Sequence, residues 1–376
     1  MHDIEEIRKL FPVVRNWTFL NHAATSPMSL PAATAMIAWA SSSAQNGGTQ
    51  NPLWRAAVEE TRSLASTLLG CSPGEIAFVQ NTSAGVSQIA WGLPLEPGDN
   101  VVSNTAEYPA NIYPWMALVE PKKIDLRLAR EHPDGRIAAD DIISACDDRT
   151  RVVAVSMVQF ATGYRMPLEE IGGFCAEEGI FFFVDAAQGL GVIDIDVNAL
   201  GIDALASAAL KWLLGPPGIA ILYCSRDKLN EIRPPVVGAA SVVNPEDFLD
   251  YDFTLAPDAR RFESGSQNLA GILALKEAIK LLLDQGIREI EERALALTDL
   301  LCRGLGEKGY EVFSPRGEAE KSPIVSFLPK DAPAPVVVKN LADNRIVTSP
   351  RCGRIRVSPH FYNTETEIEA LLDALP

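Results

Sequence analysis

The stretch of residues 181–224 constrains the fold more than any other part of the sequence. Three short apolar runs mark it, beginning at Ile180, Ala204 and Ile219, and a Gly-Pro-Pro-Gly turn precedes the third run. Apolar runs of this length, bounded by Gly and Pro, are typical of buried strands. Upstream, similar runs alternate with helical patterns, which indicates βαβ units. The sequence therefore predicts an α/β fold with a mostly parallel central sheet.

Two ionisable residues follow the first two of these runs. Asp185 ends the first run, Gln188 comes three residues later, and Lys211 follows the second run. Pyridoxal phosphate (PLP) binds a lysine as a Schiff base and keeps its protonated ring nitrogen beside a carboxylate. Apolar neighbours of the lysine favour the neutral amine that this chemistry needs. Each residue alone also fits a surface lysine or a loop-capping acid, but together with the motifs below they predict a PLP site.

The segments VDAAQ at 184–188 and GPPGIAILY at 215–223, with the lysine between them, resemble the aminotransferase class V family. This PLP-dependent family includes cysteine desulfurases, kynureninases and isopenicillin N epimerase-like enzymes. The resemblance implies fold type I, with a large domain around the mostly parallel sheet and a small α+β C-terminal domain. We expect an N-terminal segment near the active site at 1–30, a large PLP-binding domain at 31–262 and the small domain at 263–376.

The resemblance also implies roles around the cofactor. Thr82 and Ser83 stand at a strand-to-helix junction, where free backbone N–H groups favour a phosphate. Tyr108 takes the position of a side chain that stacks on the cofactor ring. Ser266, in RRFESGSQN, matches a residue that contacts the phosphate of the neighbouring subunit's cofactor, so the family pattern implies a homodimer with shared active sites. A plain helix cap or a core tyrosine explains the same residues without a ligand.

The resemblance implies a small-molecule substrate, an α-amino acid. Arg356 precedes a YNT-type ending and matches the arginine that binds the substrate α-carboxylate, for which a guanidinium fork is suited. Asn111, Gln159 and His22 are further candidates for substrate contacts. Each of them also fits an ordinary loop or core position.

The resemblance leaves the reaction type open. Cysteine desulfurases attack the substrate sulfur with a cysteine on a mobile loop, whereas Cys352 lies only four residues before Arg356. They usually carry His and Asn where this chain has Met157 and Phe160. We therefore favour a transaminase or C–S lyase. A cysteine desulfurase that uses Cys352, an epimerase, a kynureninase-like hydrolase and a catalytically degenerate PLP-fold dimer remain as alternatives.

The composition excludes some partners. A net charge of −16 argues against nucleic acid. The six cysteines have no metal-ligand spacing, so we expect no metal site and a reducing, cytoplasmic location. No apolar stretch reaches the length that a membrane span needs, so we expect no membrane association.

Overall fold

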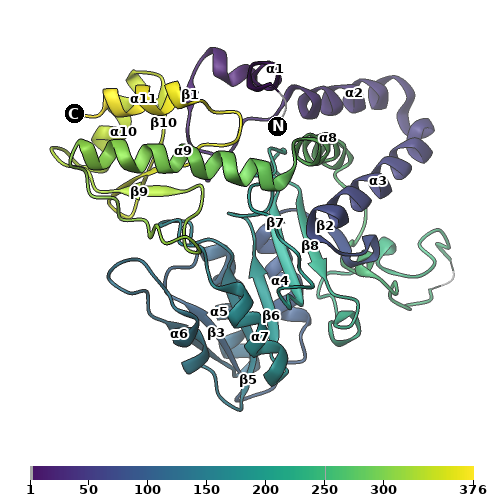
Figure 1. The fold of residues 1–376 in the computed structure, drawn as a ribbon. Helices are drawn as coiled ribbons and strands as arrows, with labels where there is room; N and C mark the ends of the chain where they lie inside the picture. The colour runs from purple at the N-terminus through teal and green to yellow at the C-terminus, as the bar shows by residue number, and fades with distance from the viewer. Residues whose placement is uncertain (1–2, 250) are drawn as a thin grey trace.

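The computed structural model describes residues 3–249 and 251–376, and its centre is a seven-stranded sheet (Figure 1). From one edge to the other the strands are β2 (Ile76–Val79), β8 (Ala220–Cys224), β7 (Ala204–Ala208), β6 (Phe181–Asp185), β5 (Thr150–Ser156), β3 (Asn100–Asn104) and β4 (Asp125–Ala129). The neighbours from β7 to β4 are parallel, and β8 is antiparallel to both β7 and β2. The predicted mostly parallel sheet is confirmed.

Side chains of the sheet alternate between two apolar layers. In β6, Phe182 and Val184 join one core, whereas Phe181 and Phe183 join the other. This alternation follows from the two-residue period of a strand, and burial of both faces explains the nearly continuous apolar runs.

Helices cover both faces of the sheet. The side chains of α4 (Thr82–Gly92) and α5 (Tyr113–Lys122) enter the core that holds Phe183. The opposite core receives α3 (Asn51–Leu69), α6 (Ala139–Ser144), α7 (Leu168–Glu178) and α8 (Leu269–Gln285). Helix α2 (Leu30–Asn46) packs on α8 through alanines that allow a close approach.

A smaller unit packs beside this body. It comprises α9 (Ile287–Glu307), β9 (Val325–Phe327), α10 (Ala334–Asp343), β10 (Ile346–Val347), β11 (Ser349–Arg351), β12 (Arg354–Val357) and α11 (Glu365–Ala374). Strands β11, β12 and β9 form an antiparallel sheet, and β1 (Thr18–Phe19) pairs with β10. Near the N-terminus lies the short helix α1 (Ile4–Arg8).

Helix α9 joins the two cores. Its Ile290 and Ala294 pack in the large core, whereas its Leu297 and Leu301 pack in the core of the smaller unit. Helix α8 contributes to the large core, so we propose that the core of the small domain begins within α9, later than residue 263. In Figure 1, α9 accordingly runs across the top of the molecule from one unit to the other.

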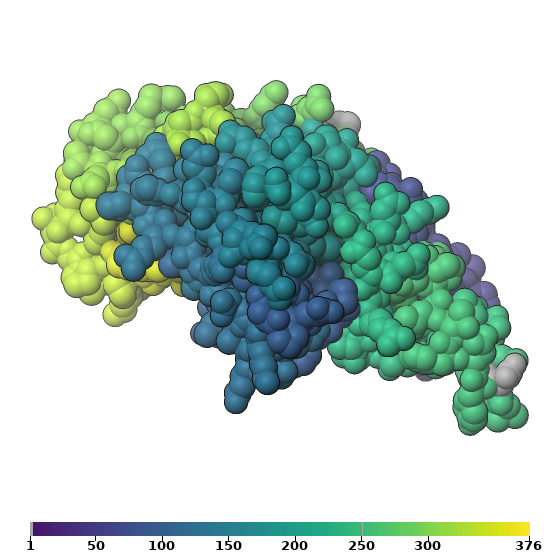
Figure 2. Space-filling view, turned by 90° about the horizontal axis from the view of Figure 1, so that it is seen from below, coloured from purple at the N-terminus to yellow at the C-terminus, as the bar shows by residue number. Residues whose placement is uncertain are grey.

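Over its described residues, the connection from β8 to α8 is irregular and holds only short 3₁₀ turns. These are η5 (Leu229–Glu231), η6 (Ala239–Ser241) and η7 (Ala259–Phe262). Earlier in the chain lie the 3₁₀ turns η1 (Pro12–Arg15), η2 (Gly47–Gln50), η3 (Pro73–Glu75) and η4 (Pro109–Asn111). Part of this connection projects from the body at the lower right of Figure 2. It exposes the large apolar side chains of Phe248, Leu249, Tyr251 and Phe253.

Over the described parts of the chain, no helix has the length and apolar character needed to cross a membrane.

Candidate active site

A cavity of about 360 Å³ lies where the carboxyl ends of the parallel strands meet. Ligands of open α/β sheets bind at this edge. The cavity brings together seven of the predicted site residues, which are Thr82, Ser83, Tyr108, Asp185, Gln188, Lys211 and Arg356. It also includes Phe160 and Arg351, which sequence reasoning had not assigned to the site. His22, Asn111, Gln159 and Ser266 do not line it.

Lys211 is held in the turn that follows β7. The pKa of its amine is lowered from 10.5 to about 8, mainly by burial and also by the charges of Arg356 and Arg351, while Asp185 opposes this shift. Its Nζ lies 5.3 Å from the centroid of the Tyr108 ring. More of the amine is therefore neutral near physiological pH than for an ordinary lysine, which favours nucleophilic and proton-transfer chemistry.

Asp185 is the last residue of β6 and is almost completely buried. Burial raises the pKa of its carboxyl to about 6, and the charge of Lys211 and the Ala187 amide oppose this rise. The Ala187 N–H donates to Oδ1 at 2.8 Å, which fixes the orientation of the carboxylate. Asp185 is thus a fixed anion at the base of the cavity at neutral pH.

The N-terminus of α4 forms another wall. Asn81 caps this helix by accepting the Ala84 N–H at 2.9 Å, and Thr82 and Ser83 begin it. The Thr82 hydroxyl accepts the Ala208 N–H at 3.1 Å, which ties α4 to the end of β7. The first turn of a helix is suited to an anion such as a phosphate. Ser207, in contrast, donates its hydroxyl to the Ala186 carbonyl at 3.3 Å.

Asn111 and Gln159 are buried beneath the cavity and bind the carboxylate of Glu107. Their side-chain amides donate to Glu107 at 3.0 Å each, and Ser156 donates its backbone N–H at 2.6 Å. Asn104 also donates to this carboxylate. Neither residue lines the cavity, and both amides help to position the loop that carries Tyr108, whereas the amide oxygen of Gln159 has no hydrogen-bond partner among the described residues.

His22 also lies outside the cavity. Its Nδ1 is 2.8 Å from the Ser358 carbonyl oxygen and its Nε2 is 2.7 Å from the Tyr362 hydroxyl. Complete burial lowers its pKa well below the usual value. Its neighbours Ala23 and Ala24 line the cavity instead, so the N-terminal segment borders the site through its backbone and small side chains.

Gln188 links this N-terminal segment to the lysine turn. Its amide nitrogen donates to the Ala23 carbonyl at 3.0 Å, and its amide oxygen accepts the Trp212 indole N–H at 3.0 Å. Both ends of the side-chain amide are therefore hydrogen-bonded within the protein, and Gln188 forms part of the cavity wall with Lys211.

Arg356 lines the cavity and has an unpaired edge on its guanidinium. Its side chain is buried, and Nη1 donates to the Phe160 carbonyl at 2.7 Å. Nε and Nη2, which form the opposite edge of the guanidinium, have no hydrogen-bond partner among the described residues. Burial and the charge of Arg351 lower the pKa of Arg356 to about 9. An unpaired buried fork is costly, and a bidentate carboxylate would satisfy it.

Cys352 lies at the tip of the β11–β12 hairpin and outside the cavity lining. Arg351 pairs with Arg354, so the hairpin turn consists of Cys352 and Gly353 alone, with φ values of 47° and 78°. Positive φ at both positions is typical of a tight type I′ turn. The cysteine is exposed.

Ser266 lies elsewhere on the chain. It is exposed on the segment before α8 and lines a separate cavity of about 400 Å³ with Gln88 and Phe262. Within one chain it does not reach the residues around Lys211. A role in the site therefore requires a second chain.

The arrangement fits PLP. The buried amine and carboxylate suit the aldehyde carbon and the ring nitrogen of the cofactor, and the α4 N-terminus suits its phosphate. Tyr108, which is 46% exposed, offers an aromatic face to the ring. The fold and site together define a fold type I PLP-dependent enzyme.

Comparisons with known proteins agree with this assignment. The family model for aminotransferase class-V matches residues 18–371. A probable cysteine desulfurase of Methanothermobacter thermautotrophicus is 30% identical over 393 residues, which cover 99% of this chain and 97% of the relative. The chain therefore belongs to the aminotransferase class V family, whose members use PLP.

Solved structures show the same fold. An apo cysteine desulfurase from Thermococcus onnurineus has a TM-score of 0.89 and 26% identity, with 99% of this chain and 97% of that chain covered. A C-DES mutant with glycine covalently linked to the PLP cofactor has a TM-score of 0.90 and 25% identity, with 97% and 98% covered. The predicted fold class is confirmed.

Proposed function

We propose that this PLP-dependent enzyme cleaves the C–S bond of a sulfur-containing α-amino acid. The observation that carries the proposal is the cavity that joins Lys211 and Asp185 to the unpaired fork of Arg356. The names of the relatives and neighbours, cysteine desulfurase above all, support a sulfur-containing substrate.

Each side chain has a separate role in this proposal. PLP, when bound, supplies an electron sink for the bond that breaks at the substrate Cα. The Arg356 fork binds the α-carboxylate and thereby fixes the Cα–H bond. The Lys211 amine accepts the Cα proton, because burial holds its pKa at about 8. Asp185 keeps a negative charge at the ring nitrogen.

Elimination is favoured over transfer of sulfur to a protein thiol. Cys352 lies in a two-residue hairpin turn rather than on a long loop, and this residue does not line the cavity. With cysteine and water as reactants, elimination gives sulfide, ammonia and pyruvate. Assays of these products, of alanine and of pyridoxamine phosphate on the purified holoenzyme distinguish elimination from desulfuration and transamination.

Cys352→Asn is expected to keep turnover within about twofold of the wild type. Asn followed by Gly is a preferred pair for a type I′ turn, so the substitution removes the thiol and retains the hairpin. Initial rates and mass spectrometry after incubation with cysteine test the expectation, with Cys71→Ala as a second thiol variant. Loss of activity in Cys352→Asn alone, with a persulfide on Cys352 in the wild type, would show a desulfurase.

We further propose a cytoplasmic homodimer with shared active sites. All six cysteines are free thiols, which suits a reducing compartment. The exposed apolar group from Phe248 to Phe253 suits a surface that a second copy covers.

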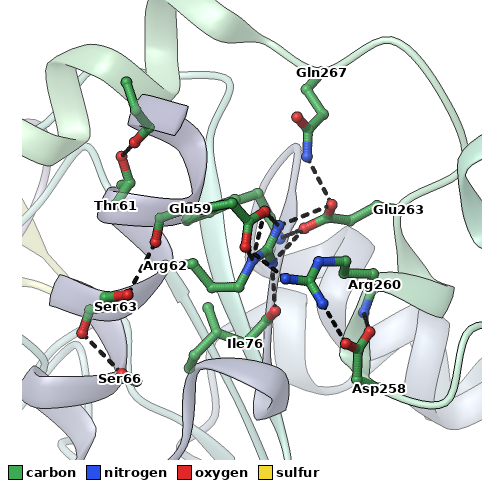
Figure 3. Close-up of polar contacts among 12 residues, drawn as sticks. Glu59, Thr61, Arg62, Ser63, Ser66, Ile76, Asp258, Arg260, Glu263 and Gln267 are labelled. Carbon is green, nitrogen blue, oxygen red and sulfur yellow. Dashed lines mark hydrogen bonds and ion pairs between the residues drawn. The ribbon is translucent and has the colours of Figure 1, made fainter. Parts of the chain in front are cut away.

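The segment that carries Ser266 is firmly anchored, as a shared site requires. Arg62 of α3 forms a buried ion pair with Glu263 at 2.9 Å, and Gln267 donates to Glu263 at 2.7 Å (Figure 3). The Phe78 N–H of β2 donates to the same carboxylate at 2.9 Å. Ser266, between Glu263 and Gln267, is therefore presented at the surface by a fixed loop.

Co-expression of Lys211→Ala with Ser266→Trp is expected to restore activity that neither variant has alone. In a mixed dimer, the intact lysine of one chain meets the intact serine of the other, so one of two sites works. Random pairing makes half of the dimers mixed, which gives about a quarter of wild-type activity. Recovery of no activity from a verified mixed dimer would contradict the shared site.

A further inference from the structure

Arg351 and Arg356 lie on one face of the β11–β12 hairpin. Ser349 pairs with Arg356, and Arg351 is two residues from Ser349. Side chains of paired residues and of alternate residues share a face, so the two arginines are diagonal neighbours with Cα atoms about 7–8 Å apart. Both line the cavity that contains Lys211.

The third arginine of this face is used differently. The Arg354 guanidinium lies 3.3 Å from the centroid of the Phe313 ring and does not line the cavity. Arg354 therefore has a packing partner in the small unit, whereas Arg351 faces the site.

The cavity has more cationic groups than the predicted cofactor and a simple amino acid need. The guanidinium groups of Arg351 and Arg356 line it, against the single carboxylate of Asp185 among the described residues, and Lys211 is taken up by the cofactor. No ion pair joins either arginine to an acid within the described parts of the chain, and Arg351 donates from Nη1 only to the Pro350 carbonyl at 2.9 Å. A surplus of positive charge in a chain with a net charge of −16 selects an anion locally.

The anionic groups of the cofactor and of an amino-acid substrate can each be matched to a partner in the cavity. The α4 N-terminus suits the cofactor phosphate, and the unpaired Nε–Nη2 edge of Arg356 suits the α-carboxylate. Glu107 accepts hydrogen bonds from the Asn111 and Gln159 amides and does not line the cavity. Arg351 is then left without an anionic partner.

We infer that Arg351 determines specificity by binding a second acidic group, on the side chain of the amino-acid substrate. The substrate class is thus α-amino acids whose side chain ends in a carboxylate or a similar anion, and a matching amide is a poor ligand. The inference rests on the proposed amino-acid substrate. It deepens that proposal because Arg356 sets the orientation and Arg351 selects the side chain.

Acid and amide pairs of equal shape test the inference on the holoenzyme. The pairs are aspartate and asparagine, glutamate and glutamine, and S-carboxymethylcysteine and S-carbamoylmethylcysteine, which differ in how far the second acid lies from Cα. Equilibrium binding is followed through the cofactor absorbance. In at least one pair we expect the acid to bind about 10- to 100-fold more tightly, as for a hydrogen-bonded charge pair.

Arg351→Gln is expected to bring that acid-to-amide ratio close to one and to leave the affinity for the amide unchanged. Arg351→Lys should keep part of the preference. Arg354→Gln is the matched control, because it removes the same charge from the same hairpin face outside the cavity, and it should preserve the ratio. A purely structural role of Arg351 would weaken acid and amide equally, and that result would overturn the inference.

The outcomes separate this inference from the proposed function. Equal binding of acid and amide in every pair overturns the inference, whatever happens to the C–S bond of cysteine. An acid preference that depends on Arg351, without C–S cleavage of any sulfur compound, supports the inference and overturns the lyase. Binding of no amino acid overturns both.

Discussion

Lys211→Ala is expected to lower turnover by at least about 10³-fold, because it removes both the covalent attachment of the cofactor and the proton acceptor at Cα. Borohydride reduction of the wild-type holoenzyme should place a pyridoxyl label on Lys211, identified by peptide mapping. Lys122 is a matched control, since burial also lowers its pKa and its Nζ donates to the Leu93 carbonyl at 2.8 Å. Lys122→Met should retain most activity and the label at Lys211.

The same experiment gives a pH dependence. The protonated amine is not nucleophilic, so the rate of reconstitution of the apoenzyme with PLP should rise with pH, with an inflection near the Lys211 pKa of about 8, and level off where the amine is fully neutral. An ordinary lysine would give an inflection near 10.5. Stopped-flow absorbance over pH 6–10 measures the profile, and a label on another lysine or an inflection near 10.5 would contradict the assignment.

Strand ends explain how much of the site the sequence could predict. Thr82, Asp185 and Lys211 each follow a predicted buried strand, and the carboxyl ends of parallel strands meet at one edge. Sequence alone was therefore enough to bring these residues together, with Arg356 added by the family pattern. The α/β class followed from the same alternation of strands and helices.

Three of the predicted residues that do not line the cavity are polar side chains that hydrogen-bond within the protein. The His22 ring is hydrogen-bonded to Ser358 and Tyr362. The side-chain amides of Asn111 and Gln159 donate hydrogen bonds to Glu107. A sequence shows that such side chains are polar, but it does not show which buried atom they satisfy. Each fits a substrate contact until its internal hydrogen bonds are known.

Arg351 was missed for a related reason. Its place in the cavity depends on the hairpin register that pairs it with Arg354. Cys352 and Gly353 set this register, and a cysteine with positive φ is not a turn signal that a sequence reveals. An Asn-Gly pair at positions 352 and 353 would have predicted the hairpin turn. The hairpin register would in turn have placed Arg351 and Arg356 on one face.

Asp185→Ala is expected to slow exchange of the substrate α-proton by roughly 10²-fold or more, which corresponds to a few kcal/mol of lost charge stabilisation. Asp185 would hold the ring nitrogen of the cofactor, and among the described residues it is the one acid that lines the cavity, so water or a neutral side chain would not replace its charge. Exchange in D₂O, followed by NMR with a bound amino acid, measures this step apart from product release. The absorbance spectrum verifies that the variant still holds PLP.

Asp203→Asn is the control variant. It distinguishes loss of the carboxylate proposed to hold the cofactor ring from loss of a buried carboxylate elsewhere in the sheet. Asp203 is another partly buried acid whose pKa is raised by burial, and it accepts the Phe182 N–H at 2.9 Å at the start of β6, away from the cavity. This variant should lose stability yet exchange the α-proton within about threefold of the wild type, because surface and scaffold changes seldom reach the reacting atoms. Equal loss in both variants would trace the effect to the sheet. Unchanged exchange in Asp185→Ala would show that the ring needs no carboxylate there, and the electron sink would then depend on another group.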